Sequence, residues 1–291
     1  MYYGSLSECR RWIERCLDTY HGRGGERLKY PVPNDAKTAA LAILPTVEWL
    51  LGNPEAAEQA VAEGLALIER SNRDFDRAYI HAWIAGLRLT QRRNAEAKAH
   101  SQIALDIANR HGFREWQVTG LVVGLLAQTV EARDHEALKT ATETCMAMAA
   151  EGVGLNASWY LWGLARGYRA IEQIPVAQQV IAQGFQRAAA SGETRMNAEL
   201  LILQAEMETD PPKAITLLES ALKLSNEQGA VANALRAVAA LVLRSSQDEA
   251  AVELARTTHQ ILEGQAGYPE EQGWMHARLA QLNDALRFVH A

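Results

Sequence analysis

Helix-terminating residues recur along this chain at an almost constant interval, and this constrains its fold more than any other feature. Asn72, Gly112, Gly152, Gly192 and Gly229 follow one another at intervals of roughly 40 residues, the length of a helix-pair repeat. Glycine, with asparagine as its usual substitute, ends helices because it adopts the left-handed backbone conformation at low cost. A second series of turn residues keeps nearly the same interval: Asn53, Asn94, Asp134, Ile174, Asp210 and Asp248.

Small residues follow the turns of the second series, which predicts close packing within each helix pair. They include Ala57, Ala97, Ala137, Ala177 and Ala214. A small side chain at this position lets the second helix lie close against the first. A fixed period of about 40 residues built from helix pairs is typical of an α-solenoid. We therefore predict an all-α fold in which the pairs stack on one another.

The predicted domain is a single repeat array over residues 1–291. A first helix over 5–20 has no partner before it, and a capping helix over 271–289 closes the chain. Between them the pattern predicts six helix pairs: 35–71, 74–111, 114–151, 156–191, 193–229 and 230–263. Because an amphipathic helix must bury its apolar face, helix 5–20 is expected to leave that face open.

Residue composition agrees with a helical class. Ala, Leu, Glu, Gln and Arg, which favour helices, are abundant, and runs of alternating β-branched residues are nearly absent. A chain of 291 residues is too long for one compact core, so it suits either two domains or one repeat array. The recurring turns favour the array.

Charge and cysteine content narrow the partners and the compartment. The formal charge of -6 and the pI of about 5.8 argue against nucleic-acid binding, which needs clustered cations. The pair Arg92-Arg93 is interpreted as a solvated helix end. Three cysteines (Cys9, Cys16 and Cys145) make no disulfide framework, which indicates a reducing compartment. Since every apolar run is shorter than the roughly 18 residues of a membrane helix, and no signal sequence is recognisable, we expect a cytoplasmic protein with no membrane segment.

Several segments carry a resemblance to known repeat proteins: Lys37–Leu44, Trp49–Ala57, Ala108–Trp116, Ser191–Arg195, Ala198–Leu200 and Ala221–Ala230. The helix pairs resemble tetratricopeptide-type repeats, although the period here is longer than in that family. More closely, the chain resembles the C-terminal repeat region of large bacterial signalling proteins. In these, an adenylate cyclase domain or a winged-helix DNA-binding domain precedes a STAND-type ATPase and then the repeats. The resemblance implies a right-handed superhelix and an upstream domain of the same polypeptide as one partner.

Motifs for catalysis and metal binding are missing from the sequence. The eight histidines follow no HExxH or other ligand spacing, and neither a Gly-x-Ser-x-Gly elbow nor a Walker motif occurs. The adjacent Glu270 and Glu271 are interpreted as a surface helix start, where carboxylates interact favourably with the helix dipole. We therefore expect neither an enzyme nor a bound cofactor or metal.

Candidate binding residues come from the first helices of the pairs, which line the concave wall of such solenoids. Aligning the turns places Trp49, Trp83, Gln91 and Tyr160 on that wall. Aromatic side chains with a polar neighbour suit a groove for a peptide or a small ligand. The alternative is that the tryptophans belong to the core between helices, because aromatic rings bury large areas.

The leading functional hypothesis is a non-enzymatic interaction or sensor module of a bacterial signalling or transcription-regulatory protein, with its protein or peptide partner on the concave face. A second hypothesis is a small-molecule sensor that holds an inducer against Trp49 and Trp83. The third is a homo-oligomer formed through the open face of helix 5–20. Direct binding of nucleic acid or membrane is not expected.

Overall fold

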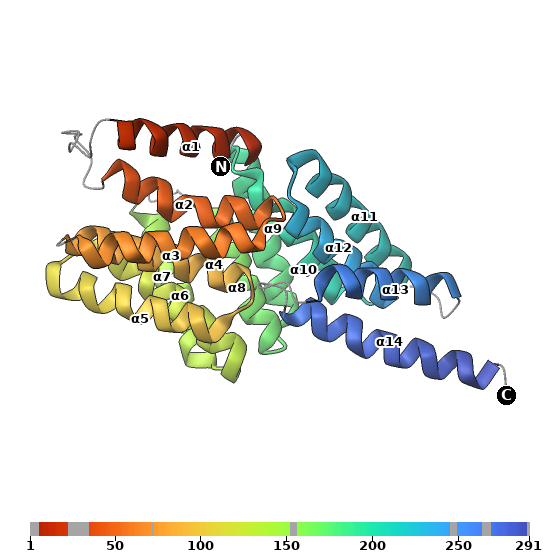
Figure 1. Cartoon of the computed structure of the whole chain (residues 1–291). Coiled ribbons are helices and arrows are strands. Elements are labelled where there is room, and N and C mark those ends of the chain that lie inside the picture. The colour runs from red at the N-terminus through yellow and green to blue at the C-terminus, as the bar shows by residue number, and fades with distance from the viewer. Residues whose placement is uncertain are drawn as a thin grey trace.

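The computed structural model describes residues 6–22, 35–71, 73–151, 156–244, 249–263 and 269–289. Within these ranges the protein is all helical, as predicted, and neighbouring helices pack in pairs (Figure 1). The α-helices are α1 Leu6–Gly22, α2 Ala36–Leu50, α3 Pro54–Arg70, α4 Asp74–Thr90, α5 Asn94–His111, α6 Arg114–Ala132, α7 His135–Ala150, α8 Ala157–Ala170, α9 Ile174–Ser191, α10 Asn197–Met207, α11 Pro211–Gln228, α12 Val231–Arg244, α13 Glu249–Leu262 and α14 Pro269–Val289. Three predicted turn or end residues, Asn72, Gly152 and Asp248, lie outside the described residues.

Local chemistry explains where many of these helices begin and end. Asp134 caps α7 by accepting a hydrogen bond from the Ala137 amide at 3.0 Å. Pro54 and Pro211 open α3 and α11, where a missing amide hydrogen is not needed. Gly112 and Gly192 end α5 and α9 with positive φ angles of 71° and 79°. The residues predicted at the helix ends therefore act through the backbone hydrogen bonds of the first and last helical turns.

A second set of left-handed residues lies in the turns within the helix pairs. Gly52, Arg92, Arg133 and Glu172 have φ angles of 85°, 63°, 53° and 64°. They recur with the same period as the predicted turns. Three of them are not glycine, although the left-handed region costs an L-residue roughly 1 kcal/mol. The geometry of the turn, and not a glycine in the sequence, therefore selects this conformation.

Replacing Arg133 with glycine is expected to stabilise the protein by about 0.5–1 kcal/mol, because it removes the strain of the positive φ angle. The ion pair from Arg133 to Glu172 contributes little, since the two side chains are 70% and 76% exposed. Urea unfolding measures the change. An Arg133→Ala variant loses the ion pair but keeps the strain, so it is the control. Equal stability of the glycine and alanine variants would refute the argument from strain.

The small residues after the turns are buried where each second helix meets the first. Ala57, Ala97, Ala177 and Ala214 are fully buried, and Ala137 is 5% exposed. Each lies in the first turn of its helix, at the point where the two helices of a pair are joined. A larger side chain would force the pair apart at its narrowest point.

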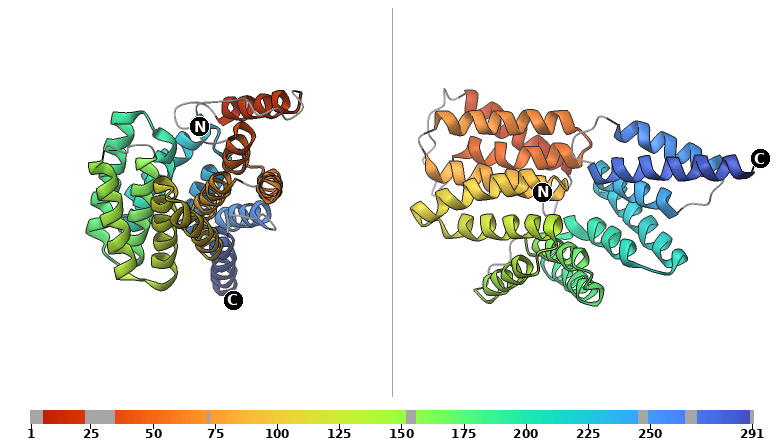
Figure 2. Two further views of the ribbon diagram at one scale, coloured as in Figure 1. Left: turned by 90° about the vertical axis from the view of Figure 1, so that its left-hand side faces the viewer. Right: turned by 90° about the horizontal axis from the view of Figure 1, so that it is seen from below.

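Even-numbered helices form an inner row. Each contacts the next even-numbered helix, from α2 to α14, whereas odd-numbered helices mainly contact their neighbours in the sequence. The row curves back so that α12 also contacts α2 (Figures 1 and 2). At this contact a Cβ added to Gly52 would lie 2.7 Å from Val231 Cγ1, so only glycine allows the approach. The curvature brings residues far apart in the sequence together.

Helix α1 does not leave its apolar face open, which corrects the expectation from the sequence. It packs on α2, where Ile13 is 7% exposed and forms a buried cluster with Ala40 and Val47. Cys9 and Cys16 pack partly buried against the same cluster. The face is covered because it packs directly against α2. On the same helix the Trp12 side chain stays exposed, at 59%.

Helix α14 begins at Pro269, slightly earlier than predicted. It contacts α12 and α13, while its far end projects away from the other helices (Figures 1 and 2). The side chain of Met275 is fully buried in the largest core cluster. The first turns of α14 are therefore part of the core.

Candidate functional site

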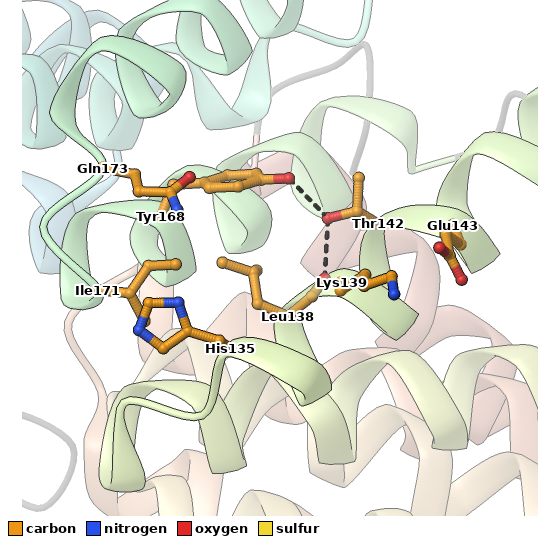
Figure 3. A pocket seen from close by; sticks show the side chains of 8 residues that line it. All are labelled: His135, Leu138, Lys139, Thr142, Glu143, Tyr168, Ile171 and Gln173. Atoms are coloured by element: carbon orange, nitrogen blue, oxygen red, sulfur yellow. Dashed lines mark hydrogen bonds between the residues drawn. The ribbon is translucent and has the colours of Figure 1, made fainter.

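A groove of about 350 Å³ lies between α7 and α8 and is a candidate binding site. Its walls are made by α7, by the end of α8 and by the turn that follows (Figure 3). The residues that line it are His135, Leu138, Lys139, Thr142, Glu143, Tyr168, Ile171 and Gln173. No residue of this set was predicted from the sequence.

Close approach of α8 to α7 forms the floor of the groove. A Cβ added to Gly167 would lie 2.6 Å from Leu138 Cδ1, so α8 lies directly on the Leu138 side chain. Leu138 is 1% exposed. Beside it, the Thr142 hydroxyl lies 3.0 Å from the Tyr168 hydroxyl and donates to the Leu138 carbonyl at 2.8 Å. These contacts form the floor of the groove, where Leu138 and Ile171 are the apolar side chains.

Polar side chains surround this floor. Lys139 is 64% exposed, and His135, Glu143 and Gln173 also reach the surface. The two hydroxyl groups, on Thr142 and Tyr168, are hydrogen-bonded to each other and not to a general base among the described residues. An apolar floor with a polar rim is the arrangement of a binding surface. The groove is therefore suited to holding an apolar group and hydrogen-bonding what surrounds it.

The four residues predicted for the concave wall lie on or next to the inner helices, but most are buried. Trp49 is fully buried, with the Arg236 guanidinium 5.0 Å from its ring centroid. Gln91 is also fully buried and accepts a hydrogen bond from Arg88 at 2.8 Å. Tyr160 is 8% exposed, with its hydroxyl 3.1 Å from that of Thr119.

Trp83, the fourth of these residues, is half-buried and packs near Tyr79, with ring centroids 6.1 Å apart. Trp49 and Trp83 belong to one core cluster and Tyr160 to another, so the four residues do not line a common wall. The alternative interpretation, that the tryptophans form core between helices, fits Trp49 and also Trp162, which is fully buried. The groove between α7 and α8 contains none of the four.

A buried cluster of charged side chains lies where the inner row curves back. Arg236 of α12 is fully buried and pairs with Glu199 of α10 and Glu271 of α14, both at 2.7 Å. Arg92 pairs with Glu270 at 2.5 Å, and Arg166 of α8 pairs with the same carboxylate at 3.4 Å. From the sequence, Arg92 and Glu270–Glu271 are predicted to be solvated. That is wrong for Arg92 and Glu271, whose side chains are 3% and 0% exposed.

Mutual charge interactions keep this cluster ionised. Burial alone would raise the pKa of Glu270, but Arg92 and Arg166 overcome this effect and lower the pKa to about 2. For Glu199, Arg236 likewise outweighs burial and lowers the pKa. Burial together with the neighbouring Arg92 lowers the pKa of Arg166 to about 10. Glu270, Glu199 and Arg166 are therefore charged at neutral pH, which makes the interior strongly polar at this point.

The sequence did contain a signal for this cluster. Arg236 lies one helical turn after Ala232 and one turn before Ala240, and both alanines are buried. A charged residue in the middle of an apolar helical stripe indicates a buried ion pair. Its partners could not be inferred, because they belong to other helices.

A histidine pair between α4 and α5 was also not expected. His81 Nδ1 lies 2.9 Å from His100 Nδ1, and the two rings stack with centroids 5.1 Å apart. Burial lowers the pKa of His81 to about 4, assisted by His100 and Arg77. The pKa of His100 is lowered by burial and by Arg88, which together outweigh Glu96. At neutral pH both imidazoles are therefore neutral, and one donates a hydrogen bond to the other.

Comparisons with known proteins assign no family to the chain. A scan against protein-family models gives no match, and a search of curated proteins finds no similar sequence. Within the part of the chain that the structure describes, no three His, Cys, Asp or Glu side chains gather in a group able to hold a metal ion. In the same part, no helix has the length and apolar character needed to cross a bilayer.

Proposed function

We propose that this protein is a non-enzymatic interaction module, a tetratricopeptide-like α-solenoid with a right-handed superhelix that binds a peptide segment of a partner protein. The groove between α7 and α8 is the observation that carries the proposal. Regular spacing of the left-handed turn residues Gly52, Arg92, Arg133 and Glu172 supports the repeat architecture. The segments that resemble bacterial signalling proteins support a cytoplasmic role beside an ATPase, cyclase or DNA-binding domain.

The chemistry of the groove indicates what kind of peptide it would bind. Ile171 offers the accessible apolar surface for one anchoring side chain, since Leu138 beside it is 1% exposed. Lys139, Glu143 and Gln173 stand around it, where they would hydrogen-bond the backbone or polar side chains of the peptide. Burial of a single apolar anchor in such a pocket contributes about 1.5–3 kcal/mol. Micromolar affinity corresponds to about 8 kcal/mol, so most of the binding free energy would have to come from further contacts along the peptide.

Panning the full chain against a phage-displayed random peptide library is expected to enrich peptides with an aliphatic or aromatic anchor. Ile171→Thr removes part of the floor and Lys139→Glu reverses the charge of the rim. Each should weaken the binding of the enriched peptides about tenfold, equivalent to about 1.4 kcal/mol, in fluorescence anisotropy.

Lys98→Glu makes the same charge change as Lys139→Glu on an exposed part of α5, away from the groove, so its affinity should match that of the wild type. Circular dichroism checks that every variant is folded. Enriched peptides that bind all three variants equally well would show that the groove is not the site. Failure to enrich any peptide would count against the interaction module itself.

A small-molecule sensor is the second candidate, and the groove volume favours it, since ligand pockets begin at roughly 300 Å³. Trp49 gives it no support, because its ring is fully buried beneath Arg236. Thermal-shift screening of a metabolite library tests this candidate. A ligand that stabilises the wild type and Lys98→Glu, but not Ile171→Thr, would favour a sensor over a peptide-binding module.

A further inference from the structure

The buried charged cluster has the form of a recognition site for carboxylates. Three buried arginines, Arg92, Arg166 and Arg236, come from three different parts of the inner row. They meet at the first turn of α14, where the Glu270 carboxylate contacts Arg92 and Arg166. The neighbouring Glu271 contacts Arg236 at 2.7 Å and Arg92 at 3.6 Å. We call the three arginines, with Arg169 at the edge, the arginine cradle.

Charge in the cradle is balanced only when α14 is in place. Apart from α14, its ion-pair partners among the described residues are Glu199 and Glu206, and Glu206 contacts Arg169 at 2.7 Å and Arg92 at 3.6 Å. Four arginines then face two glutamates, which leaves an excess of two positive charges. Glu270 and Glu271 neutralise this excess. Since uncompensated buried charges are strongly unfavourable, the cradle requires two further carboxylates from some source.

The first turns of α14 meet this requirement at the edge of the core. Trp274, one turn after the two glutamates, places its ring centroid 5.3 Å from the Arg92 guanidinium. Beyond these turns the helix runs away from the inner row toward the C-terminus (Figure 2). The Glu270 side chain is 32% exposed and Arg169 is 37% exposed, so the cradle opens to solvent on this side.

We propose that the arginine cradle is a binding site for an acidic peptide that begins a helix with two adjacent glutamates or aspartates, and that α14 occupies this site in the same chain. A partner of this kind would displace the start of α14 and take over its contacts. The site is separate from the groove between α7 and α8, so each of the two proposals can be tested without the other.

Fluorescence anisotropy with a peptide of residues 269–282, labelled with fluorescein at its C-terminus, tests the proposal. The attached α14 competes at a high effective concentration, so the wild-type chain should bind the peptide weakly. Glu270→Gln/Glu271→Gln in the full chain weakens this competitor and should increase the affinity for the peptide at least tenfold. A peptide in which both glutamates are glutamine should bind the same variant at least tenfold more weakly. Equal binding of the two peptides would overturn the proposal.

Further variants separate the cradle from its surroundings. Glu270→Gln alone changes a partly exposed carboxylate and serves if the double variant does not fold, as judged by circular dichroism. In whichever of these two glutamine variants is used, a further Arg169→Gln change should reduce peptide affinity at least threefold. A further Arg133→Gln change, on the exposed turn after α6, should not reduce it. Failure of Arg169→Gln to reduce it would overturn the assignment. Citrate is added as a competitor. If citrate binds as tightly as the peptide and displaces it, the cradle is a site for a small carboxylate and the claim for a peptide is overturned.

Discussion

Replacing Arg236 with methionine will destabilise the protein by about 3–5 kcal/mol, because the change strands two carboxylates in the interior. Arg236 is fully buried, and both of its partners, Glu199 and Glu271, are no more than 1% exposed. Methionine keeps the apolar length of the side chain over the Trp49 ring, so the loss reports mainly on charge. Urea unfolding followed by circular dichroism measures it.

Two comparison variants separate charge from packing in this experiment. Arg114→Met breaks an ion pair to Glu151 in which the side chains are 72% and 50% exposed, and it should cost less than about 1 kcal/mol. In the double variant Arg236→Met/Glu199→Met, one stranded carboxylate is removed, so this variant should be more stable than Arg236→Met alone. If the double variant is less stable than the single one, uncompensated charge is not the cause.

Acidification from pH 7.5 to 5 will destabilise the protein by about 1–2 kcal/mol through His81, after allowance for its partial exposure. Its pKa is lowered to about 4 in the folded chain, against about 6.5 in the unfolded chain. Below pH 6.5 the unfolded state therefore binds a proton that the folded state does not. The stabilising contribution of neutral His81 is complete above pH 6.5 and is lost as the pH falls toward 4.

Stability measured against pH for His81→Gln tests this linkage. Glutamine retains a hydrogen-bonding group toward His100 but does not titrate, so the variant should lose about 1–2 kcal/mol less than the wild type over this range. His276→Gln, at an exposed position of α14, is the control for replacing any histidine. Parallel stability curves for His81→Gln and the wild type would contradict the assignment to His81.

Prediction from the sequence was most successful where the physics is local. Helix ends follow from glycines such as Gly112 and caps such as Asp134, whose hydrogen bonds reach about one helical turn along the chain. The buried alanines after the turns, such as Ala97, follow from the spacing of the turns. The all-helical class was predictable for the same reason.

Prediction was least successful for side chains whose surroundings come from other helices. Arg92 and Glu271 were interpreted as solvated because charged residues at helix ends usually are, yet they lie far apart in the sequence and meet in the interior. Trp49 and Tyr160 were placed on an open wall, but Trp49 is buried under Arg236 of α12 and Tyr160 is buried next to α6, with its hydroxyl 3.1 Å from that of Thr119. The groove was missed because its floor depends on Gly167 lying against Leu138.

The sequence by itself determined the all-helical class and the positions where helices begin and end, because capping, turn geometry and helix propensity act between residues close in the chain. Only the tertiary structure decided which charged residues are buried, which carboxylates balance the arginine cradle and where a groove remains open. The burial of the charged residues depends on how far the inner row curves, and the groove depends on the contact of α8 with α7. The curvature is the sum of many small packing angles between helices, and no single turn in the sequence specifies it.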